Sequence, residues 1–363
     1  MTAFLTGVKT VAAQEFRLRI RAGRWRWLLA AWFVTLAAFT VLVRLALAAS
    51  GEDDRPLGTP MYGSLMLLVL GMGLLVVPAL TAQSVNGDRE RGTLATLQIT
   101  RLTPAQIAAG KLAAAWGTSL VFLALTLPLV AWTVAEGGVP AGRLVVTTLV
   151  MALMLGVVCA IAQALSALLL RSTTSAVLSY LVVFALTIGT LIVFGLATAL
   201  TTETVTRTVR QPVPVEPVPV PGGGFTVEPP RPGEFEEYTY TTTQARTDQV
   251  WWLLAPNPFV VLADAAPALP RRRDPVTQRP LPSAFDPLGE LSRSVRSLRE
   301  PPSEPDSYRG LAPEPEPQPE SQRRPVWPYG LAVNLLLGAG SLVITTRRLR
   351  TPARNLPRGM RVA

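Results

Sequence analysis

Six stretches without a charged residue divide the chain into long apolar segments. They run over residues 27–43, 56–87, 112–135, 144–170, 172–202 and 325–346 and contain between 17 and 32 residues each. About 20 apolar residues in a helix cover the roughly 30 Å of hydrocarbon in a bilayer, so each stretch can hold one crossing. Arg44 interrupts the first apolar segment, but its long side chain can reach the membrane surface from near a helix end. The pattern predicts an all-α polytopic membrane protein with six transmembrane helices.

The first apolar segment has an alternative interpretation as a cleaved signal peptide. Ala46-Leu47-Ala48 has the small-x-small form of a cleavage site. The 26-residue leader before the segment, the length of the segment and Arg44 just before the site all favour a retained helix. We therefore expect spans one to five within residues 27–200 and span six at 329–346.

The basic residues predict the orientation, because Lys and Arg are retained on the cytoplasmic side of a membrane. The flanks 1–26, 84–111 and 347–363, together with Arg171, hold 17 basic residues against three acidic ones. The opposite short flanks hold two basic residues, Arg55 and Arg143, against four acidic ones. Both termini are thus predicted to lie in the cytoplasm, in a multi-pass protein of the cytoplasmic membrane. This asymmetry accounts for the net charge of +10, so we expect no nucleic-acid partner.

The composition excludes most catalytic mechanisms. The chain has no histidine and one cysteine, Cys159, within an apolar stretch. This leaves no His-based triad, no disulfide and no Cys/His metal cluster. We expect neither an enzyme nor a bound cofactor.

Residues 201–328 form one large segment between spans five and six. Because five spans precede it and the N-terminus is predicted to be cytoplasmic, the segment is predicted to lie on the extracytoplasmic side. It contains 25 of the 33 prolines, so a long Pro-rich extracytoplasmic loop is predicted, with Pro212 to Pro232 and Pro301 to Pro319 as extended linkers. Alternation of apolar and polar residues around 205–209 and 235–240 indicates a small hairpin. The uncharged segment 249–263 is too short to span a membrane. It is interpreted either as a re-entrant or interfacial helix pair or as a patch that packs the loop onto the outer helix ends.

The leader 1–26, with Trp27 directly after it, combines arginines with Phe16, Leu18, Ile20 and Trp25. This composition is typical of a helix at an anionic membrane surface. The alternative is a simple basic anchor that only sets the topology.

The cytoplasmic loop 84–111 contains two signals for helix starts. Asp88 can cap a short helix that carries Leu94 and Leu97. Thr103 and Pro104, with Gln106 three residues after Thr103, form a predicted capping box for a second helix that continues into span three. The loop is interpreted either as a rigid lever or as a solvated helical hairpin.

This loop resembles the cytoplasmic loop of the ATP-binding-cassette (ABC) type-2 exporter permeases. The matching residues are the block 88–94 (Asp-Arg-Glu-Arg-Gly-Thr-Leu), the Thr103-Pro104 turn and Gly110-Lys111. Six spans, a basic leader and Asn257-Pro258-Phe259 before span six agree with the family as well. Two features depart from it: Ala95 stands where the family often has a glutamate, and the outer loop is longer.

The resemblance implies a permease subunit that works with a separate ABC ATPase, present in two copies, and with a second permease copy or a related permease. It implies that a coupling helix in the loop contacts the ATPase. The implied contacts are Glu90, Arg91, Gly92, Thr93, Leu94, Thr103, Pro104 and Gln106. The sequence has no phosphate-binding loop of its own, since Ala105 and Leu112 replace the required residues around Gly110-Lys111.

The substrate pathway is less well specified. Gln83, Gln163 and Asn334 are polar residues within or near the spans that could line it, or that could equally bridge neighbouring helices. The alternative function is a membrane-anchored scaffold or sensor that displays the 201–328 loop.

Overall fold

The computed structural model describes residues 2–21, 24–50, 56–92, 102–212, 218–219, 225–226, 235–269, 285–301 and 324–350. Within these residues, six helical segments are long and apolar enough to cross a membrane. They are α2 (Arg24–Ala49), α3 (Gly58–Thr81), α6 (Pro104–Leu125) with α7 (Leu127–Ala135), α8 (Ala141–Leu168), α9 (Ser172–Phe184) with η1 (Ala185–Gly189) and α10 (Thr190–Leu200), and α14 (Trp327–Arg348). Six helices of spanning length and composition thus occur where the six spans are predicted, which is consistent with an all-α polytopic membrane protein.

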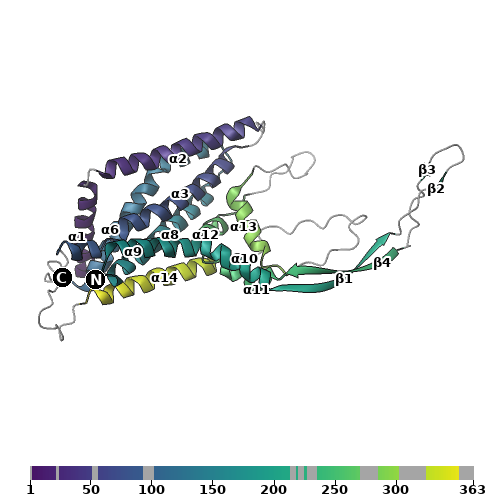
Figure 1. Ribbon diagram of the computed structural model, residues 1–363. Helices are drawn as coiled ribbons and strands as arrows, with labels where there is room; N and C mark the ends of the chain where they lie inside the picture. Colours follow the sequence, from purple (N-terminus) through teal and green to yellow (C-terminus); the bar gives the residue numbers. More distant parts are fainter. Residues whose placement is uncertain are drawn as a thin grey trace.

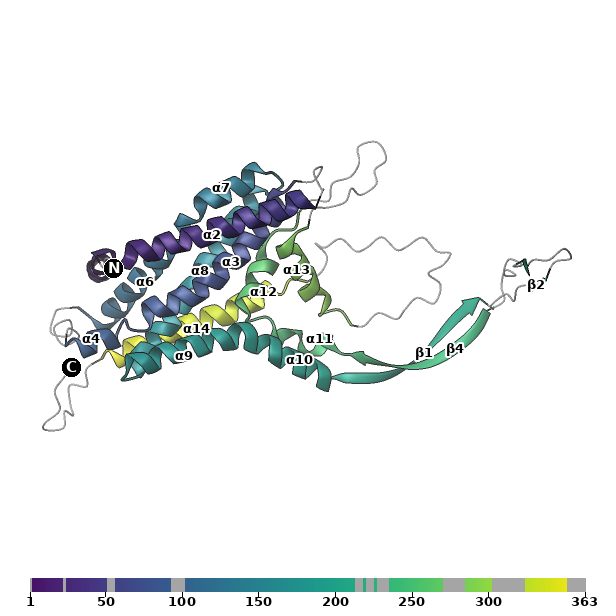
Figure 2. The ribbon, with the colours of Figure 1, turned by 45° about the horizontal axis from the view of Figure 1, so that its top comes forward.

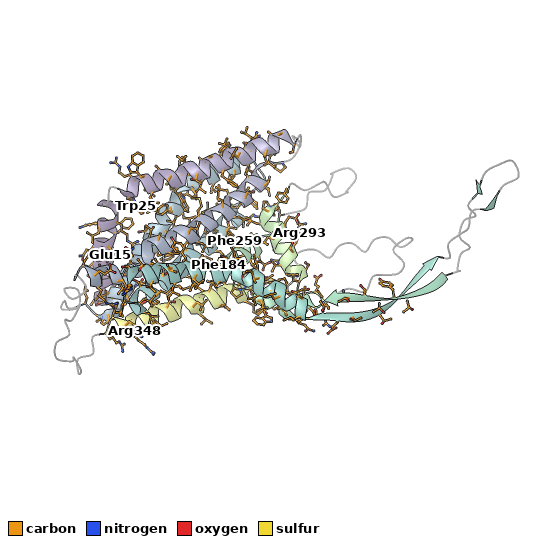
Figure 3. All side chains as sticks on the ribbon, viewed as in Figure 1. Glu15, Trp25, Phe184, Phe259, Arg293 and Arg348 are labelled. Carbon is orange, nitrogen blue, oxygen red and sulfur yellow. The ribbon has the colours of Figure 1, made fainter. Side chains whose placement is uncertain are left out.

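The spanning helices run side by side, and α1 (Thr2–Arg21) lies across one end of them (Figures 1 and 2). Glu15 and Arg348 lie at this end, and Arg293 lies at the other (Figure 3). The strands β1 (Thr202–Pro212) and β4 (Phe235–Ala245) extend away from the second end (Figure 1). We call the end with α1 the inner end and the opposite one the outer end, following the sidedness that the basic residues predict.

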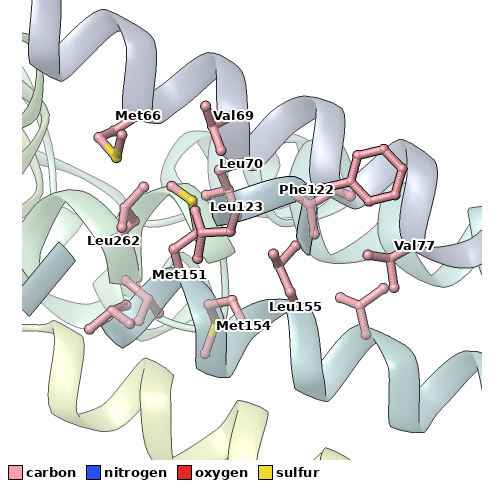
Figure 4. Packing of buried hydrophobic residues seen from close by; sticks show 14 of the residues in the cluster. Met66, Val69, Leu70, Val77, Phe122, Leu123, Met151, Met154, Leu155 and Leu262 are labelled. Atoms are coloured by element: carbon pink, nitrogen blue, oxygen red, sulfur yellow. The ribbon is translucent and has the colours of Figure 1, made fainter. Parts of the chain in front are cut away.

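The core lies between α3, α6, α8 and α12. Buried apolar side chains such as Leu70, Phe122, Met151 and Leu262 pack against one another there (Figure 4). Of the 18 most apolar consecutive residues in the second and in the fourth span, which contain α3 and α8, over half are buried. In the fifth span, α9–α10, only 6% of the corresponding residues are buried. The fifth span therefore turns almost all of its apolar surface away from the rest of the chain.

Regular α-helix is interrupted in two of the spans. The third span breaks at Thr126, two residues before Pro128, which cannot donate a backbone hydrogen bond. The fifth span contains one π-helical segment, η1. Asn257 donates its side-chain amide to the Thr187 carbonyl and the Thr190 hydroxyl, at 2.8 and 2.9 Å. Asn257 thereby attaches the segment before α12 to the irregular part of this span.

The predicted hairpin is confirmed and is longer than the sequence indicated. β1 (Thr202–Pro212) pairs antiparallel with β4 (Phe235–Ala245), and Val205 lies opposite Thr242. Part of the stretch expected to be a linker is a second small pair, β2 (Val218–Pro219) with β3 (Phe225–Thr226). The stretch expected as a second linker, 301–319, lies outside the described residues after its first position.

The uncharged segment 249–263 forms short helices: the end of α11 (Thr247–Val250), η2 (Trp251–Leu253) and most of α12 (Pro258–Ala265). Trp251 packs edge-on against Tyr329 at the start of α14, and nearly all of α12 is buried. The segment thus packs onto the outer helix ends, as the second interpretation predicted. Its helices are those that the first interpretation required, and their insertion at the membrane surface stays a prediction.

A further helix in the outer segment, α13 (Pro287–Ser297), was not predicted. Leu288 and Val295 are buried, and Leu291 packs against both neighbouring apolar clusters. Helical spacing of these three apolar residues could have indicated the helix, but the many prolines of the segment argued against substantial helix there. The segment 201–328 is therefore only partly a loop.

Candidate functional site at the inner end

The predicted coupling loop begins with a short helix, α4 (Asn86–Glu90), which follows α3 after a tight turn. Asp88 does not cap this helix as predicted, because the N-cap position is Val85 and Asp88 lies inside the helix. A buried partner across the site explains the difference, since the Asp88 carboxylate binds Lys111. Thr93, Leu94 and Leu97, which belong to the second half of the predicted helix, lie outside the described residues.

Lys111 is the centre of a buried ion cluster. Its side chain is 1% exposed, and its ammonium group contacts the carboxylates of Glu15 on α1 and Asp88 on α4. It also donates to the Ser84 carbonyl at 3.0 Å. Removing an ammonium group from water is costly unless opposite charges and acceptors compensate it. The two carboxylates supply that compensation, and the cluster ties α1, α4 and α6 together.

The capping box at the start of α6 is confirmed. The Gln106 backbone donates to the Thr103 hydroxyl at 3.3 Å, and the Thr103 backbone donates to the Gln106 side chain at 2.7 Å. The Gln106 amide also donates to the Ala3 carbonyl at 3.1 Å, so the cap holds the beginning of α1.

The leader helix therefore packs against the protein rather than only against a membrane surface. Val11 is 2% exposed, and a Cβ added at Gly110 would lie 2.6 Å from the Val11 Cβ. The small residue at 110 allows this close approach of α1 and α6.

Glu90 links α4 to the fifth span. Its carboxylate accepts hydrogen bonds from the Ser172 hydroxyl and from the Ser172 backbone N–H, the latter at 3.3 Å. It thus caps the N-terminus of α9, where a negative charge is favourable. Arg89 donates to the Leu169 carbonyl at 3.2 Å. The backbone N–H groups of Val85 and Asn86 both donate to the Ser166 hydroxyl at 3.1 Å, which fixes α4 to the end of α8.

The C-terminal end of α4 remains at the surface. The Arg91 side chain is 69% exposed and pairs with Asp88 one turn earlier. Gly92 has a φ of 69°, which suits glycine, and a Cβ there would meet nothing within 4 Å. Thr103 is also exposed, whereas Gln106 is buried against α1 and Pro104 is half-buried. Glu90 is exposed as well. Glu90, Arg91, Gly92 and Thr103 are consequently the described residues of the predicted contact set whose surface is most available to a partner.

Sequence reasoning did not assign partners to two residues that connect this surface to the spans, Glu15 and Ser172. Ser166 stood among the polar residues that could line the pathway or bridge helices, and it bridges α8 to α4. Lys111 was considered as a basic flank residue and as part of the Gly110-Lys111 match, without a buried role. The available signal was the presence of acids, Glu15 and Asp88, in flanks that are otherwise strongly basic. An acid in such a place indicates an internal partner for a buried cation.

The candidate pathway residues occupy three different environments. Gln83 is exposed at the end of α3. Gln163 is buried and donates to the Ala108 carbonyl at 2.9 Å, and Asn334 donates to the Pro256 and Gly330 carbonyls at 2.9 and 2.8 Å. Gln163 and Asn334 therefore bridge neighbouring elements, which is the second role that their position suggested.

No group of histidine, cysteine, aspartate and glutamate side chains in the described part of the chain could hold a metal ion. Comparison with family models and with curated proteins finds no match for this chain. We call α1, α4 and the start of α6 the inner-end platform. It is the best-defined candidate site in the described part of the chain.

Proposed function

We propose that the chain is the permease subunit of an ABC exporter, which couples ATP hydrolysis by a separate ATPase subunit to the efflux of a substrate. Two ATPase copies and a second permease copy or related permease would complete the transporter. It would lie in the cytoplasmic membrane, with both termini in the cytoplasm. The resemblance of the loop 84–111 to that of type-2 exporter permeases motivates this proposal.

The observation that carries the proposal is the connection of one exposed helix end to four spans. Arg91 and Gly92 are exposed at the end of α4. The same short helix is bound to α6 by Lys111, to α9 by Glu90 and to α8 by the Ser166 hydroxyl, and it follows α3 directly. A helix that only formed a solvated hairpin would not need buried charges and caps on three neighbours.

Force on α4 would reach the spans through these contacts. Ion pairs and charge-assisted hydrogen bonds are short and directional, so they move the attached helix ends as one body. ATP-driven closure of two ATPase subunits beneath the platform would push on α4, and Lys111 would pass that displacement to α6 and α1. Glu90 would pass it to α9, the span with the most uncovered apolar surface.

The work would come from the partner because the chain lacks the usual means of capturing energy. The charge-free stretches contain no carboxylate for a proton relay, and the sequence has no phosphate-binding loop. An external ATPase is the energy source that the platform best fits.

The test compares two arginines that have the same local geometry at opposite ends of the protein. Arg91 pairs with Asp88, and Arg293 pairs with Glu290, each across three positions. Tagged wild type, Arg91→Ala and Arg293→Ala are purified from native membranes in mild detergent. We expect an ABC ATPase and ATP hydrolysis with wild type and Arg293→Ala, and a several-fold loss of both with Arg91→Ala. Absence of any ATPase from all three preparations would refute the proposal.

One observation favours a second candidate function, the membrane-anchored scaffold or sensor. The β1–β4 ribbon extends well away from the helices (Figures 1 and 2). In a scaffold this ribbon would be the working part, and the platform would serve only to hold the spans. The same purification separates the two candidates, since a scaffold retains its partners when Arg91 is replaced and loses them when residues 202–245 are deleted.

A further inference from the structure

Four buried polar atoms at the inner end have no hydrogen-bond partner within the described residues. They are Arg19 Nη1 on α1, Ser84 Oγ in the turn after α3, Asn86 Nδ2 on α4 and Gln163 Oε1 on α8. Nearly all buried polar groups in proteins are hydrogen-bonded, either to protein or to ordered water. A group of such atoms from four elements therefore requires an explanation.

Hydrogen bonds and ion pairs place the residues that carry these atoms, or residues one helical turn from them, next to the same ion cluster. Ser84 belongs to the turn whose carbonyl accepts from Lys111, and Arg19 lies one helical turn after Glu15, which also binds Lys111. Gln163 donates to the Ala108 carbonyl, one turn before Lys111. The Asn86 backbone donates to Ser166, one turn after Gln163.

The polar surroundings continue along α8 to Cys159, one turn before Gln163. The Cys159 thiol lies 3.4 Å from the Ser119 hydroxyl and 4.0 Å from the Thr81 hydroxyl. Residues 149–158 of α8 are apolar, and Leu155, Met154 and Met151 belong to the main hydrophobic cluster (Figure 4).

Arg19 is half-buried, and its buried Nη1 atom has no hydrogen-bond partner among the described residues. Desolvation lowers the pKa of its guanidinium, and the nearby Glu15 carboxylate offsets this only in part. An unpaired donor on a partly desolvated cation is a strong site for any small acceptor.

The mixture of donors and acceptors suits a ligand that can both donate and accept hydrogen bonds. Arg19 and Asn86 offer donors, Gln163 offers an acceptor, and the Ser84 hydroxyl can do either. A metal cation would be repelled by the guanidinium, and an anion by the carboxylates of Glu15 and Asp88. Water both donates and accepts, and buried waters typically make two to four hydrogen bonds to groups of this kind.

We propose that Arg19, Ser84, Asn86 and Gln163 form an internal hydrated site, in which ordered water molecules join the leader helix to α3, α4 and α8 and reach Cys159. This inference concerns the buried junction and does not rest on the proposed ATPase partner. It implies that polar, water-mediated contacts hold the inner face of α1, whereas apolar packing holds the middle of the bundle.

Hydroxyl-radical footprinting of the full-length protein in lipid nanodiscs tests the site, because radicals generated from bound water modify the sulfur atoms next to it. The chain supplies its own control: Cys159, Met151 and Met154 all lie on α8 and are 0 to 1% exposed. Each oxidation rate is divided by the rate of the same residue in the denatured protein, which corrects for the higher intrinsic reactivity of a thiol. We expect the corrected rate at Cys159 to be several-fold higher than that at either methionine. Equal protection of all three sulfur atoms would overturn the proposal, and this comparison needs no variant.

A variant then assigns the water to its ligands. Gln163→Leu removes the orphaned acceptor and should slow the oxidation of Cys159 while leaving Met151 unchanged. Thr198→Val is the control, because the Thr198 hydroxyl is also buried without a partner but lies on α10. An unchanged rate at Cys159 in correctly folded Gln163→Leu would contradict the assignment of Gln163 to the site.

Discussion

Asp286 accepts two hydrogen bonds from a single guanidinium nitrogen of Arg143, with Nη2 at 2.7 Å from Oδ1 and 2.8 Å from Oδ2, although 143 positions separate the residues. Arg143 lies near the start of α8 and is 2% exposed, and Asp286 directly precedes α13. At the other end of α13, Arg296 binds the buried carboxylate of Asp264, which also accepts from the Val326 backbone at 2.6 Å. Two buried charge pairs thus fix α13 to the outer ends of α8, α12 and α14.

Breaking the first pair from one side should destabilise the protein strongly. Arg143→Ala leaves the Asp286 carboxylate partly buried without its cation, which typically costs about 3–5 kcal/mol. The measurement is unfolding of the purified protein by detergent titration. The double variant Arg143→Met with Asp286→Leu removes both charges and should recover much of the loss. A double variant as unstable as the sum of the two single ones would contradict this account.

A methyl group at Gly110 should loosen the leader helix. Its Cβ would lie 2.6 Å from the Val11 Cβ and 3.0 Å from the Val8 carbonyl oxygen, so α1 has to move away from α6. We expect Gly110→Ala to destabilise the protein by roughly 1–3 kcal/mol through overpacking. Trypsin should also cut faster at Arg17 on α1.

Gly117 on the same helix is the matched control, because a Cβ there meets nothing within 4 Å. Gly117→Ala should be neutral or slightly stabilising, by up to about 1 kcal/mol from helix propensity. Faster cleavage at Arg17 in this variant, or none in Gly110→Ala, would show that close packing at residue 110 is not what holds α1.

The base of the β ribbon should loosen in acid. Arg246 pairs with Glu203 on β1 at 2.8 Å and with Asp248 on α11 at 2.9 Å. The hydrogen bond from Arg246 lowers the pKa of Asp248 below its usual value. A group with a lowered pKa in the folded state contributes stability above its unfolded pKa, about 3.9 for aspartate, and loses it as the pH falls through the folded pKa.

We therefore expect proteolysis near residue 246 by an acid-stable protease to accelerate below about pH 4, with a small amplitude because the pair is largely solvated. Arg246→Gln should be cleaved faster at neutral pH and should show little further change in acid. A wild-type rate that stays flat down to pH 2 would argue against a role for the Asp248 charge.

Cysteine labelling tests the predicted orientation. After replacement of Cys159 by serine, Ser294→Cys on α13 and Thr10→Cys on α1 each place one exposed thiol at one end of the protein. An impermeant maleimide should label residue 294 in intact cells and residue 10 only after permeabilisation. The reverse pattern would place the platform outside and would remove the basis for an ATPase partner.

The spans could be predicted from the sequence because lipid tolerates no unpaired charge, which leaves long charge-free stretches. The charge-free stretches alone do not give the full lengths of the helices. α6 begins at Pro104, as the capping box predicted, eight positions before its charge-free stretch. The helix can carry Lys111 inside the folded chain because Glu15 and Asp88 neutralise its charge. The pattern of charges along the sequence does not reveal that Lys111 binds Glu15, which lies 96 positions away.

The outer segment shows the same division. Alternating apolar and polar residues around Val205 predicted the ribbon, and its β-branched threonines extend it to Thr202. α13 was not predicted, because the many prolines of the segment argued against a helix. Its position depends on the ion pair between Asp286 and Arg143, which lies in another part of the chain. In the inner-end platform, the local capping box of Thr103 was predictable, whereas the cap that Glu90 provides for α9 depends on tertiary structure.

The most direct test of the proposed function is a photo-crosslinking amino acid placed at Arg91 in cells, with the same amino acid at Arg293 as the control. The account predicts that the adduct formed at residue 91 contains an ABC ATPase and that the adduct at residue 293 does not. Adducts at residue 91 that contain only lipid, or proteins without an ATP-binding cassette, would contradict the central claim that the end of α4 is the contact for an ATPase subunit.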